Sequence, residues 1–552
     1  MKIDVIILWV VYFLILSVAG IMLGKIMAHI FKEKGVALEE KILKLIGIDA
    51  FTAMNWKEYL LAVIVFNFVG LILLQLILMT QHWHPFNPEA RNGLSFWMAF
   101  NIATSFVTNT NWQNYGGEST LSYFSQMLGL TVQNFLSAST GMAVLLVFIR
   151  SLVKKEITFM GNFWSDLTRF TVRILLPLSF VFALFLISQG VPQTLNGSVS
   201  VKTLEGKELK VPVGPVASQI AIKMNGSNGG GFFNANAAHP FENPTPVSNF
   251  FQLITILLLP VSCVFMLIFM LPRKQEGYPV LGVMTVLLLL GVVLSYWAQV
   301  QTIPITHMSF REGVDSRFSL SECSLWSVAT TAVSNGSVNC MHSSLSPLAQ
   351  LVALFNMMTG EVIFGGVGAG LYGMLLYVLM TVFLAGLMVG RTPEYLGKKI
   401  ESKEVIWASF ALLAPGLFNL LFSAWALNFQ LGLASLSHSG SHGLSEVLYA
   451  FSSTFGNNGS AFAGLNANTT FYNITTGFAM LFGRFAVIVP VLIIAGSLGP
   501  KKKSPIGPGT LKTDTLLFGV LLFSVILILG ALTFFPVLVL GPVAEHLILN
   551  IF

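Results

Sequence analysis

Long apolar runs alternate with polar connections along almost the entire chain. Each run has roughly the 20 residues that an α-helix needs to cross the hydrocarbon core of a bilayer, so the pattern predicts an all-α membrane protein with about ten spans. The runs lie near residues 4–24, 59–80, 126–149, 170–189, 249–271, 279–299, 350–389, 406–428, 473–497 and 515–536. The seventh run is longer than one span requires, and the end of the last one beyond Phe535 is ambiguous. The first run is too long for a signal-peptide core and lacks a small-residue cleavage site, so we expect it to remain as a span.

Four of the polar connections contain a second kind of apolar segment, which is too short to cross a membrane. These segments cover about residues 94–107, 215–224, 322–333 and 444–455, and each is followed by Asn, Gly, Ser or Thr. An apolar segment of about 10–14 residues between two spans is typical of a re-entrant element. For any single copy, an interfacial helix followed by a polar loop explains the pattern equally well.

The polar tracts that follow these segments repeat four times. Aligned on one asparagine, their kernels are Thr108-Asn109-Thr110, Ser227-Asn228-Gly229, Ser334-Asn335-Gly336 and Asn457-Asn458-Gly459. Each kernel lies between two spans, so the repeated unit is a span, a short pore helix, a polar loop and a span. We therefore predict four pseudo-symmetric repeats with extra N- and C-terminal spans. The expected units are 1–25, the four repeats 59–150, 167–271, 278–390 and 405–498, and the C-terminal helix and tail 512–552.

Composition and charge support a membrane protein and predict its orientation. Hydrophobic residues make up 54% of the chain and charged residues only 10%, against about 25% charged in soluble proteins. The net charge of +6 does not indicate nucleic-acid binding, because the basic residues lie in short loops between apolar runs. Of the 30 lysines and arginines, 21 lie in the loops 25–58, 150–173, 272–277, 391–404 and 501–512. The positive-inside tendency then places these loops in the cytoplasm and both termini outside.

The fourfold tracts have the chemistry of a potassium filter. Irregular backbone at membrane depth is tolerated only where protein buries it or where it lines a water-filled path. Glycine permits the positive φ values that turn carbonyl groups toward one axis, and rings of carbonyls replace the hydration shell of a potassium ion. The short helices would also point their partially negative C-terminal ends at the same centre. The predicted filter residues are Thr108, Asn109, Thr110, Asn111, Ser227, Asn228, Gly229, Gly230, Ser334, Asn335, Gly336, Ser337, Asn457, Asn458 and Gly459.

Two ionisable residues within the spans are candidates for gating. Glu361 precedes four glycines that predict a broken helix, and broken spans are where transporters build gates. Arg484 lies in the ninth span, where we expect its charge to repel potassium from the direct cytoplasmic exit, while Glu361 attracts a cation or pairs with Arg484. A structurally paired arginine and close packing of small residues are the alternatives. The four glycines of the predicted gating loop are Gly365, Gly366, Gly368 and Gly370.

Cysteine and catalytic chemistry are sparse. We expect Cys263, in an apolar run, to be an inert core thiol. Cys323 and Cys340 flank one polar loop, where a disulfide is compatible with an oxidising compartment and two free thiols remain the alternative. The sequence has no Cys/His spacing typical of zinc or haem, no paired catalytic acids and no phosphate-binding or aspartyl-phosphorylation motif. We therefore predict no catalytic site and no cofactor in this chain.

Five segments resemble the potassium-translocating A-subunit family of the bacterial Kdp potassium-pumping ATPases. They are "VTNTNWQNYGGE", "NGGGFFNANAAHPFENPTP", "TTAVSNGSVNCMH", "GEVIFGGVGAGLYGM" and "NNGSAFAGL", and the resemblance runs from end to end. It implies a multi-pass protein of the bacterial inner (plasma) membrane that binds external potassium with high affinity. One departure is Asn335, where the family leads us to expect a smaller residue.

The same resemblance implies an ATP-driven uptake complex. The expected partners are a P-type ATPase subunit (B) that uses ATP and magnesium, a single-span subunit (C) and a small hydrophobic subunit (F). Potassium would leave the vestibule sideways into the B subunit. The family is distantly similar to the Trk, Ktr and HKT transporters, so a self-contained potassium channel or symporter is the alternative function.

Overall fold

Ten long apolar helices form the body of the protein, as the hydrophobic pattern predicts. The computed structural model describes residues 3–33, 35, 37–45, 47–49, 52–301, 310–388, 390–504 and 511–551. Within these residues, ten helices are long and apolar enough to cross a membrane. They are α1 (Ile3–Lys32), α3 (Trp56–Met79), Ser125–Val153, Phe163–Ser188, α10 (Pro246–Met270), Lys274–Gln299, α14 (Ala369–Met388), α15 (Ser402–Asn428), α18 (Thr470–Leu498) and Leu516–Leu549.

Four of these spans are composites of consecutive helical segments. Three contain a π-helical turn, and a fourth begins with a 3-10 turn. Their segments are η2 (Ser125–Thr131) with α6 (Val132–Val153); α7 (Phe163–Phe170), η3 (Thr171–Leu175) and α8 (Leu176–Ser188); η5 (Lys274–Gly277) with α11 (Tyr278–Gln299); and α19 (Leu516–Leu538), η7 (Val539–Val543) and α20 (Ala544–Ile551). The chain beyond Phe535, which the sequence leaves ambiguous, is therefore helical through its last described residue.

Four short helices lie where the sequence predicts pore helices. They are α4 (Phe96–Val107), α9 (Val216–Asn225), α12 (Leu320–Ala332) and α17 (Gly440–Gly456). Each packs against the span that precedes it, because α3 contacts α4, α8 contacts α9, α11 contacts α12 and α15 contacts α17. The overlong seventh run is divided into α13 (Pro347–Met358) and α14, with the glycine-rich segment between them. The fold is thus four repeats of span, short helix, polar loop and span, with α1 packed on α10 and α19 packed on α11 and α14.

Capping side chains define where some of these helices begin. At the start of α12, the Ser319 hydroxyl accepts a hydrogen bond from the Glu322 amide at 3.3 Å. The Glu322 carboxylate in turn accepts one from the Ser319 amide at 2.8 Å. The same reciprocal box joins Asn55 and Glu58 at the start of α3. These boxes satisfy amides that a helix N-terminus otherwise leaves unpaired.

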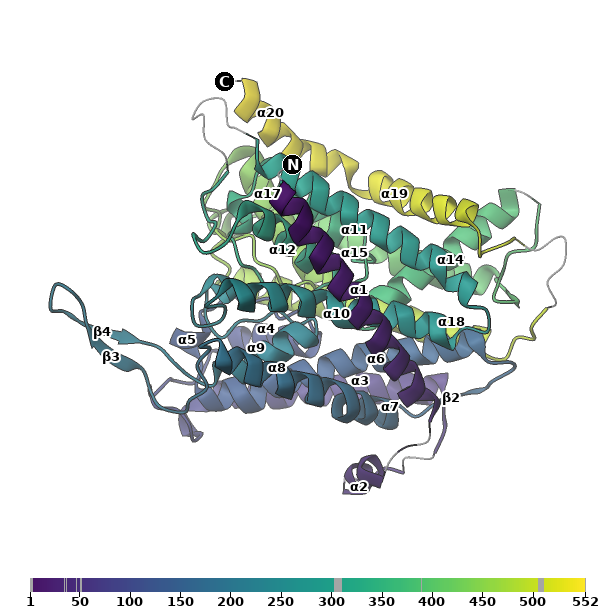
Figure 1. The fold of residues 1–552 in the computed structure, drawn as a ribbon, viewed down its shortest axis with the longest axis horizontal. Helices are drawn as coiled ribbons and strands as arrows, with labels where there is room; N and C mark the ends of the chain where they lie inside the picture. The colour runs from purple at the N-terminus through teal and green to yellow at the C-terminus, as the bar shows by residue number, and fades with distance from the viewer. Residues whose placement is uncertain are drawn as a thin grey trace.

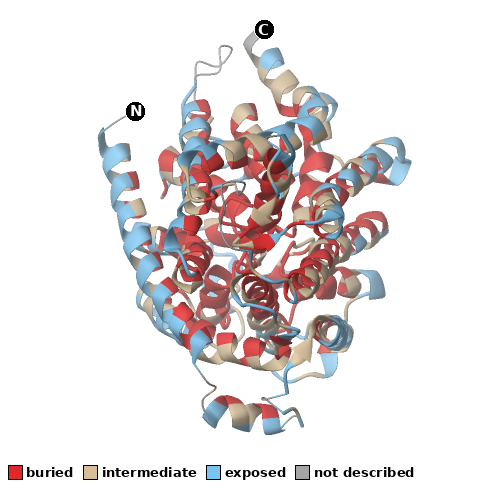
Figure 2. Cartoon of the chain, turned by 90° about the vertical axis from the view of Figure 1, so that its right-hand side faces the viewer, coloured by how far each residue is buried: buried red, intermediate tan, exposed pale blue. Residues whose placement is uncertain are grey.

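Buried residues gather in the middle of the helix bundle, and exposed ones lie at its periphery (Figure 2). Much of that periphery is apolar: Leu14, Phe180 and Leu532 are 63%, 66% and 78% exposed. Apolar side chains on an outer surface match lipid tails, which are as apolar as leucine. The protein is a multi-pass membrane protein.

Several short elements other than the spans and the four short helices were not predicted from the sequence. Short antiparallel pairs join β1 (Met54–Asn55) to β2 (Phe159–Gly161), β3 (Val199–Lys202) to β4 (Glu208–Val211), and β5 (Glu394–Tyr395) to β6 (Lys398–Lys399). Small helices are α2 (Ala37–Leu45), α5 (Gly117–Thr120), η1 (Gln81–Trp83), η4 (Asn236–Ala238), η6 (His342–Ser344) and α16 (Gln430–Leu433).

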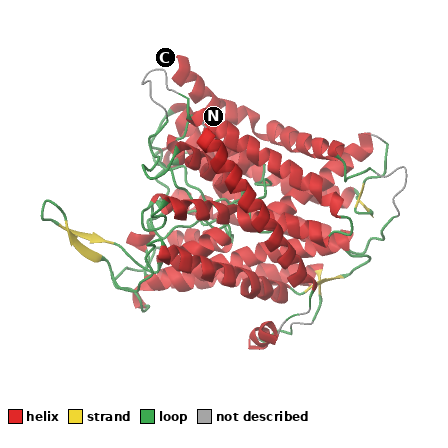
Figure 3. Cartoon of the chain, viewed as in Figure 1, coloured by secondary structure: helices red, strands yellow, loops and turns green. Residues whose placement is uncertain are grey.

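The two ends of the bundle differ in the connections that they carry. The β3–β4 hairpin projects from one end, and the loops that follow the short helices gather there, among the helix ends (Figure 3). The pairs β1–β2 and β5–β6 lie at the opposite end. Both described chain ends lie toward the hairpin end (Figure 1).

Candidate functional site

The four short helices deliver the four polar tracts to the interior of the bundle. We name residues 108–111 tract 1, 227–230 tract 2, 334–337 tract 3 and 457–460 tract 4. The helices α4, α9, α12 and α17 end within two residues of their tracts. Every tract residue is buried, although all are polar or glycine. The bundle therefore encloses polar chain at a depth where lipid would not tolerate it.

Tract 1 is hydrogen-bonded to both of its neighbours in the ring. The Asn109 side-chain amide donates to the Ser227 carbonyl of tract 2 at 2.9 Å. On the other side, the Asn457 side-chain amide of tract 4 donates to the Thr110 hydroxyl oxygen at 2.9 Å. Tract 1 therefore lies between tracts 2 and 4.

Tract 3 closes the ring from the other side. The Ser334 hydroxyl donates to the Asn457 carbonyl of tract 4 at 2.7 Å. The Asn335 side-chain amide donates to the carbonyl of Lys223, in the last turn of α9 before tract 2, at 3.2 Å. The four tracts, which the sequence predicts to act together, thus meet in one closed ring.

The backbone conformation corrects our alignment of tract 1. In each tract, two residues with positive φ flank one residue without it: Asn109 (66°) and Asn111 (56°), Ser227 (50°) and Gly229 (82°), Ser334 (55°) and Gly336 (84°), Asn457 (59°) and Gly459 (97°). The central residue is therefore Thr110 in tract 1 and Asn228, Asn335 and Asn458 in the others. Our assignment of Thr110 to the position of the glycines is wrong, because tract 1 has threonine where the other tracts have their central asparagine, so an alignment on asparagine shifts it by one residue.

Backbone hydrogen bonds confirm the corrected register. The Thr110 amide donates to the Ser105 carbonyl, five residues earlier, at 2.9 Å. The amides of Asn228, Asn335 and Asn458 do the same to Lys223, Thr330 and Ser453 at 3.0, 3.1 and 2.8 Å. All four tracts thus leave their short helices in the same way, and Asn111 stands where the others have glycine.

The three tract glycines are required because a side chain would be too crowded at these positions, and because their φ values are positive. A Cβ on Gly229 would overlap the Asn335 carbonyl oxygen, and one on Gly459 would overlap that of Thr110. A Cβ on Gly336 would lie 2.5 Å from the Asn458 carbonyl oxygen. Each glycine therefore lets one tract approach the backbone of the next.

Asn335, the residue that departs from the expected family pattern, is held within the ring. Its side-chain oxygen accepts hydrogen bonds from the amide and the hydroxyl of Ser337. The Asn458 side-chain oxygen is bonded in the same way to Ser460, at 3.0 and 2.5 Å, and the Asn458 side-chain amide donates to the Thr330 carbonyl at 2.9 Å. Asn335 and Asn458 thus fasten tracts 3 and 4 to the short helix of the preceding repeat, α9 and α12.

The glycine-rich segment after α13 lies directly against tract 3. The Gly365 amide donates to the Ala332 carbonyl, at the end of α12, at 3.2 Å. A Cβ on Gly366 would lie 3.2 Å from the Ser334 Cβ. Gly365 and Gly368 have φ values of 65° and 76°, and the helix resumes only at Ala369. The predicted break in this helix is confirmed.

Glu361 lies beside tracts 3 and 4. Its side chain is 3% exposed and lies next to the Ser334 and Asn458 side chains. A Cβ on Gly456, the last residue of α17, would lie 3.5 Å from the Glu361 carboxyl carbon. This places a carboxyl group at the base of the ring.

Arg484, from α18, extends toward α6 rather than toward Glu361. Its Nη2 donates to the Ser137 carbonyl at 3.1 Å, and the side chain is buried. A Cβ on Gly141 of α6 would contact both Nη2 and the Val367 carbonyl, so the arginine lies beside the glycine-rich segment. Among the ion pairs of the described residues, none joins Arg484 to Glu361. The alternative in which these two residues pair is not found.

Several buried polar atoms at the ring have no hydrogen-bond partner within the described residues. They are both side-chain atoms of Asn111, Ser227 Oγ, Asn228 Oδ1, Glu361 Oε1 and Arg484 Nε. Buried polar atoms are usually paired with protein or with water. These atoms are therefore available to a water molecule or an ion at the ring.

Comparison with known proteins identifies the family. The family model described as KdpA, potassium-transporting ATPase A subunit, matches residues 10–547. The chain belongs to the KdpA family. It is 53% identical over 530 residues to the potassium-transporting ATPase potassium-binding subunit of Leptospira interrogans serovar copenhageni, covering 96% of this chain and 95% of the relative. The subunit of the same name from Erwinia tasmaniensis is 50% identical over 545 residues, covering 97% of each.

A solved structure shares the fold. The crystal structure of the potassium transporter TrkH from Vibrio parahaemolyticus matches with a TM-score of 0.51 at 14% identity, covering 86% of this chain and 96% of that one. This similarity supports the four-repeat helical architecture of this KdpA-family chain, and at such low identity it supports the fold alone.

Sequence reasoning missed a buried ion pair behind tract 2 of this KdpA-family chain. Lys223 Nζ, fully buried in α9, donates to Glu242 Oε2 and to Asn236 Oδ1, each at 2.5 Å. The Asn236 side-chain amide then donates to the Gly229 carbonyl at 2.7 Å. The signal was present, because Lys223 is a lysine in an apolar segment that ends at a tract.

A second missed residue is Gln113, just after tract 1. Its side chain donates to the Gly231 carbonyl and accepts from the Gly231 amide, both at 2.9 Å. This pair of hydrogen bonds joins the chain leaving tract 1 to the chain leaving tract 2.

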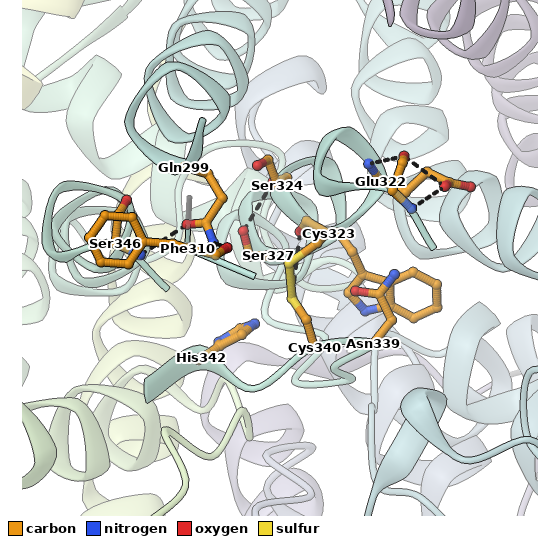
Figure 4. Close-up of a disulfide and its surroundings, with 12 residues drawn as sticks. Gln299, Phe310, Glu322, Cys323, Ser324, Ser327, Asn339, Cys340, His342 and Ser346 are labelled. Carbon is orange, nitrogen blue, oxygen red and sulfur yellow. Dashed lines mark hydrogen bonds between the residues drawn. A yellow bond between two sulfur atoms is a disulfide. The ribbon is translucent and has the colours of Figure 1, made fainter. Parts of the chain in front are cut away.

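A disulfide joins the start of α12 to the chain that leaves tract 3. It links Cys323 to Cys340, with the two Cα atoms 6.0 Å apart (Figure 4). Of the two alternatives that the sequence leaves open, the structure has the disulfide. Cys263 is a buried free thiol, as predicted.

Proposed function

We propose that this chain binds potassium selectively from the outer side and passes it through the membrane as the channel-like subunit of an ATP-driven uptake complex. The closed ring of four buried tracts is the observation that carries this proposal. Relatives that are about 50% identical to this chain over nearly their full length, such as the Leptospira and Erwinia proteins, are named as potassium-binding subunits. The ring supplies the place where such an ion would bind.

Three features of the ring suit a dehydrated cation. The alternation of positive φ values lets consecutive carbonyl groups turn toward one centre. Four short helices end at the ring, and each helix C-terminus carries about half a negative charge. The unpartnered oxygens of Ser227, Asn228 and Glu361 add further acceptors near the same place. Carbonyl number and field strength then favour potassium over sodium.

The proposed route below the ring is gated by the glycine-rich segment and Arg484. The segment lies against tract 3, and Arg484 lies beside it with a positive charge that repels potassium from a direct exit. Ions would therefore leave sideways, into a P-type ATPase subunit (B) that uses ATP and magnesium. A single-span subunit (C) and a small hydrophobic subunit (F) complete the proposed complex.

The proposed location is the bacterial plasma membrane, with both termini outside. The hairpin end of the bundle holds both described chain ends (Figure 1). The opposite end holds the connections in which the lysines and arginines concentrate.

Reconstitution tests the proposal against a self-contained channel or symporter. The chain alone should give no selective potassium flux, and the complex with its ATPase subunit should take up potassium when ATP is added. Passive, selective flux through the chain alone would favour the alternative.

Replacing Arg484 with glutamine should open a leak. The arginine is buried, and a charge in a low-dielectric surrounding acts on an ion severalfold more strongly than in water. We expect ATP-independent potassium flux in vesicles to rise, or hydrolysis to become uncoupled from uptake. Arg484→Lys keeps the charge and is the matched control. If Arg484→Gln changes neither the leak nor the coupling, the role of Arg484 is purely structural.

Alanine at Gly366 or Gly368 should slow transport more than it weakens ion binding. Gly368 has positive φ and touches the Gly141 backbone, so alanine there is strained as well as crowded. At Gly366, alanine would favour helix by about 1 kcal/mol and press on Ser334. Uptake rates and potassium titrations of ATPase activity separate the two effects, with Gly282→Ala, which has open space, as the control. Normal rates in both variants would argue for simple packing of small residues.

A further inference from the structure

Outside the ion pathway, two histidines and a glutamate meet at the hairpin end of the bundle. His438 precedes α17, while His442 and Glu446 lie in its first two turns. One ligand atom from each residue lies within 4.8 Å of the other two. Sequence reasoning expected no metal cluster in this chain, since it searched for Cys/His spacings. The described residues contain this one, in which a carboxylate takes the place of a cysteine.

The side chains of the cluster lie close enough for their ligand atoms to share one ion. His438 Nδ1 lies 2.7 Å from Glu446 Oε1, and the rings of His438 and His442 are 4.5 Å apart between centroids. Glu446 is fully buried, whereas the His438 side chain is 51% exposed. The cluster therefore joins a fixed carboxylate to an imidazole that solvent can reach.

A second carboxylate supports the same interpretation. Glu545, in the first turn of α20, has Oε1 at 2.9 Å from His442 Nδ1. Its other oxygen, Oε2, is buried and has no hydrogen-bond partner within the described residues. A carboxylate bonded to one nitrogen of an imidazole is the usual outer partner of a metal-ligating histidine, because it fixes the orientation and tautomer of the ring.

Hydrogen bonds already join the cluster to two serines, Ser437 and Ser343. The Glu446 carboxylate already accepts hydrogen bonds from the amide and the hydroxyl of Ser437, at 3.2 and 2.5 Å. The Ser437 hydroxyl also lies 2.8 Å from His438 Nδ1, so Ser437 links the carboxylate to this imidazole. The Ser343 hydroxyl lies 3.0 Å from His442 Nε2, the ring nitrogen that Glu545 does not occupy, so an ion bound at this nitrogen would displace the serine.

We propose that His438, His442 and Glu446 form a binding site for a divalent transition-metal ion of the zinc class, with Glu545 positioning His442. Two imidazoles and one carboxylate form a ligand set that zinc uses, and a fourth position is open to water. Magnesium and calcium prefer sites built of oxygen ligands, so imidazoles disfavour them. A bound ion would join the chain before α17 to the pore helix that ends at tract 4.

The site can be tested on the full-length chain, purified without a histidine tag and stripped with a chelator. Cobalt(II) serves as the probe, because its visible absorption reports the number and geometry of its ligands. We expect one equivalent to bind with the spectrum of a four- or five-coordinate site, and zinc to displace it. Magnesium in excess should not displace the bound cobalt.

Variants assign the site to these residues. His438 is exposed, so His438→Gln should fold normally and still bind cobalt at least tenfold more weakly than the wild type. Glu545→Gln should weaken binding by about 10- to 100-fold, as expected for the loss of an outer partner. His82→Gln, an exposed histidine elsewhere, is the matched control and should bind as the wild type does. Binding unchanged in both His438→Gln and His442→Gln, or the absence of saturable cobalt binding to the wild type, would overturn the proposal. Neither result depends on potassium transport.

Discussion

Serine in place of Gly336 is expected to weaken potassium binding by about one to two decades. Gly336 has a φ of 84°, and a Cβ there would lie 2.5 Å from the Asn458 carbonyl oxygen. A non-glycine residue in such a conformation costs roughly 1–3 kcal/mol. Since about 1.4 kcal/mol corresponds to a factor of ten in affinity, the strain alone accounts for the predicted loss. Gly229→Ser and Gly459→Ser should behave alike, because both would overlap a neighbouring carbonyl.

The measurement is a potassium titration of ATPase activity in the assembled complex, repeated with rubidium, ammonium and sodium. A distorted ring should also let these ions compete better, since selectivity depends on the geometry of the carbonyls. Growth at limiting potassium gives an independent readout. If all three serine variants assemble normally and keep wild-type affinity and ion preference, the four tracts are not the filter.

Tract 1 offers matched controls. Asn111 stands where the other tracts have glycine, and asparagine tolerates its φ of 56° better than most residues do. Asn111→Gly should therefore keep the backbone conformation, although it removes a buried polar side chain. Thr110→Ser retains the hydroxyl that accepts from Asn457 and should be milder than Gly336→Ser.

Much of this arrangement was predictable, because membrane spans and their repetition leave strong signals. The ten spans follow from apolar run length, and the break before α14 follows from the clustered glycines. The four short helices are predictable since each is an apolar segment too short to span. These features depend on local composition, which the sequence displays directly.

What the sequence could not supply depends on which distant residues meet. The register of tract 1 depends on the hydrogen bond from Thr110 to Ser105, and residue identity put Asn109 where the structure has Thr110. That Arg484 bonds to Ser137 rather than to Glu361 depends on how α18 faces α6. The ion pair between Lys223 and Glu242 joins two residues that are 19 positions apart in the sequence, across an irregular segment whose path the sequence does not specify.

The buried ion pair between Lys223 and Glu242 gives the second prediction with a large expected effect. Glu242→Gln or Lys223→Met should each strongly impair the complex. Both side chains are fully buried, and removing one partner of a buried ion pair typically costs about 3–5 kcal/mol because the other charge remains unpaired. Thermal unfolding of the purified chain measures this loss. Lys207→Met, which breaks an exposed pair with Glu205, is the control and should have no measurable effect.

A double variant distinguishes two roles of the ion pair, which are to neutralise buried charge and to hold the conformation of tract 2. Lys223→Met with Glu242→Gln leaves no unpaired charge, so much of the lost stability should return. Ion preference should not return with it, because Lys223 Nζ also fixes Asn236, whose amide donates to the Gly229 carbonyl at 2.7 Å. We therefore expect a stable complex with poorer discrimination between potassium and sodium. If the double variant regains both stability and wild-type discrimination, the pair only balances buried charge, and the Gly229 carbonyl is oriented without it.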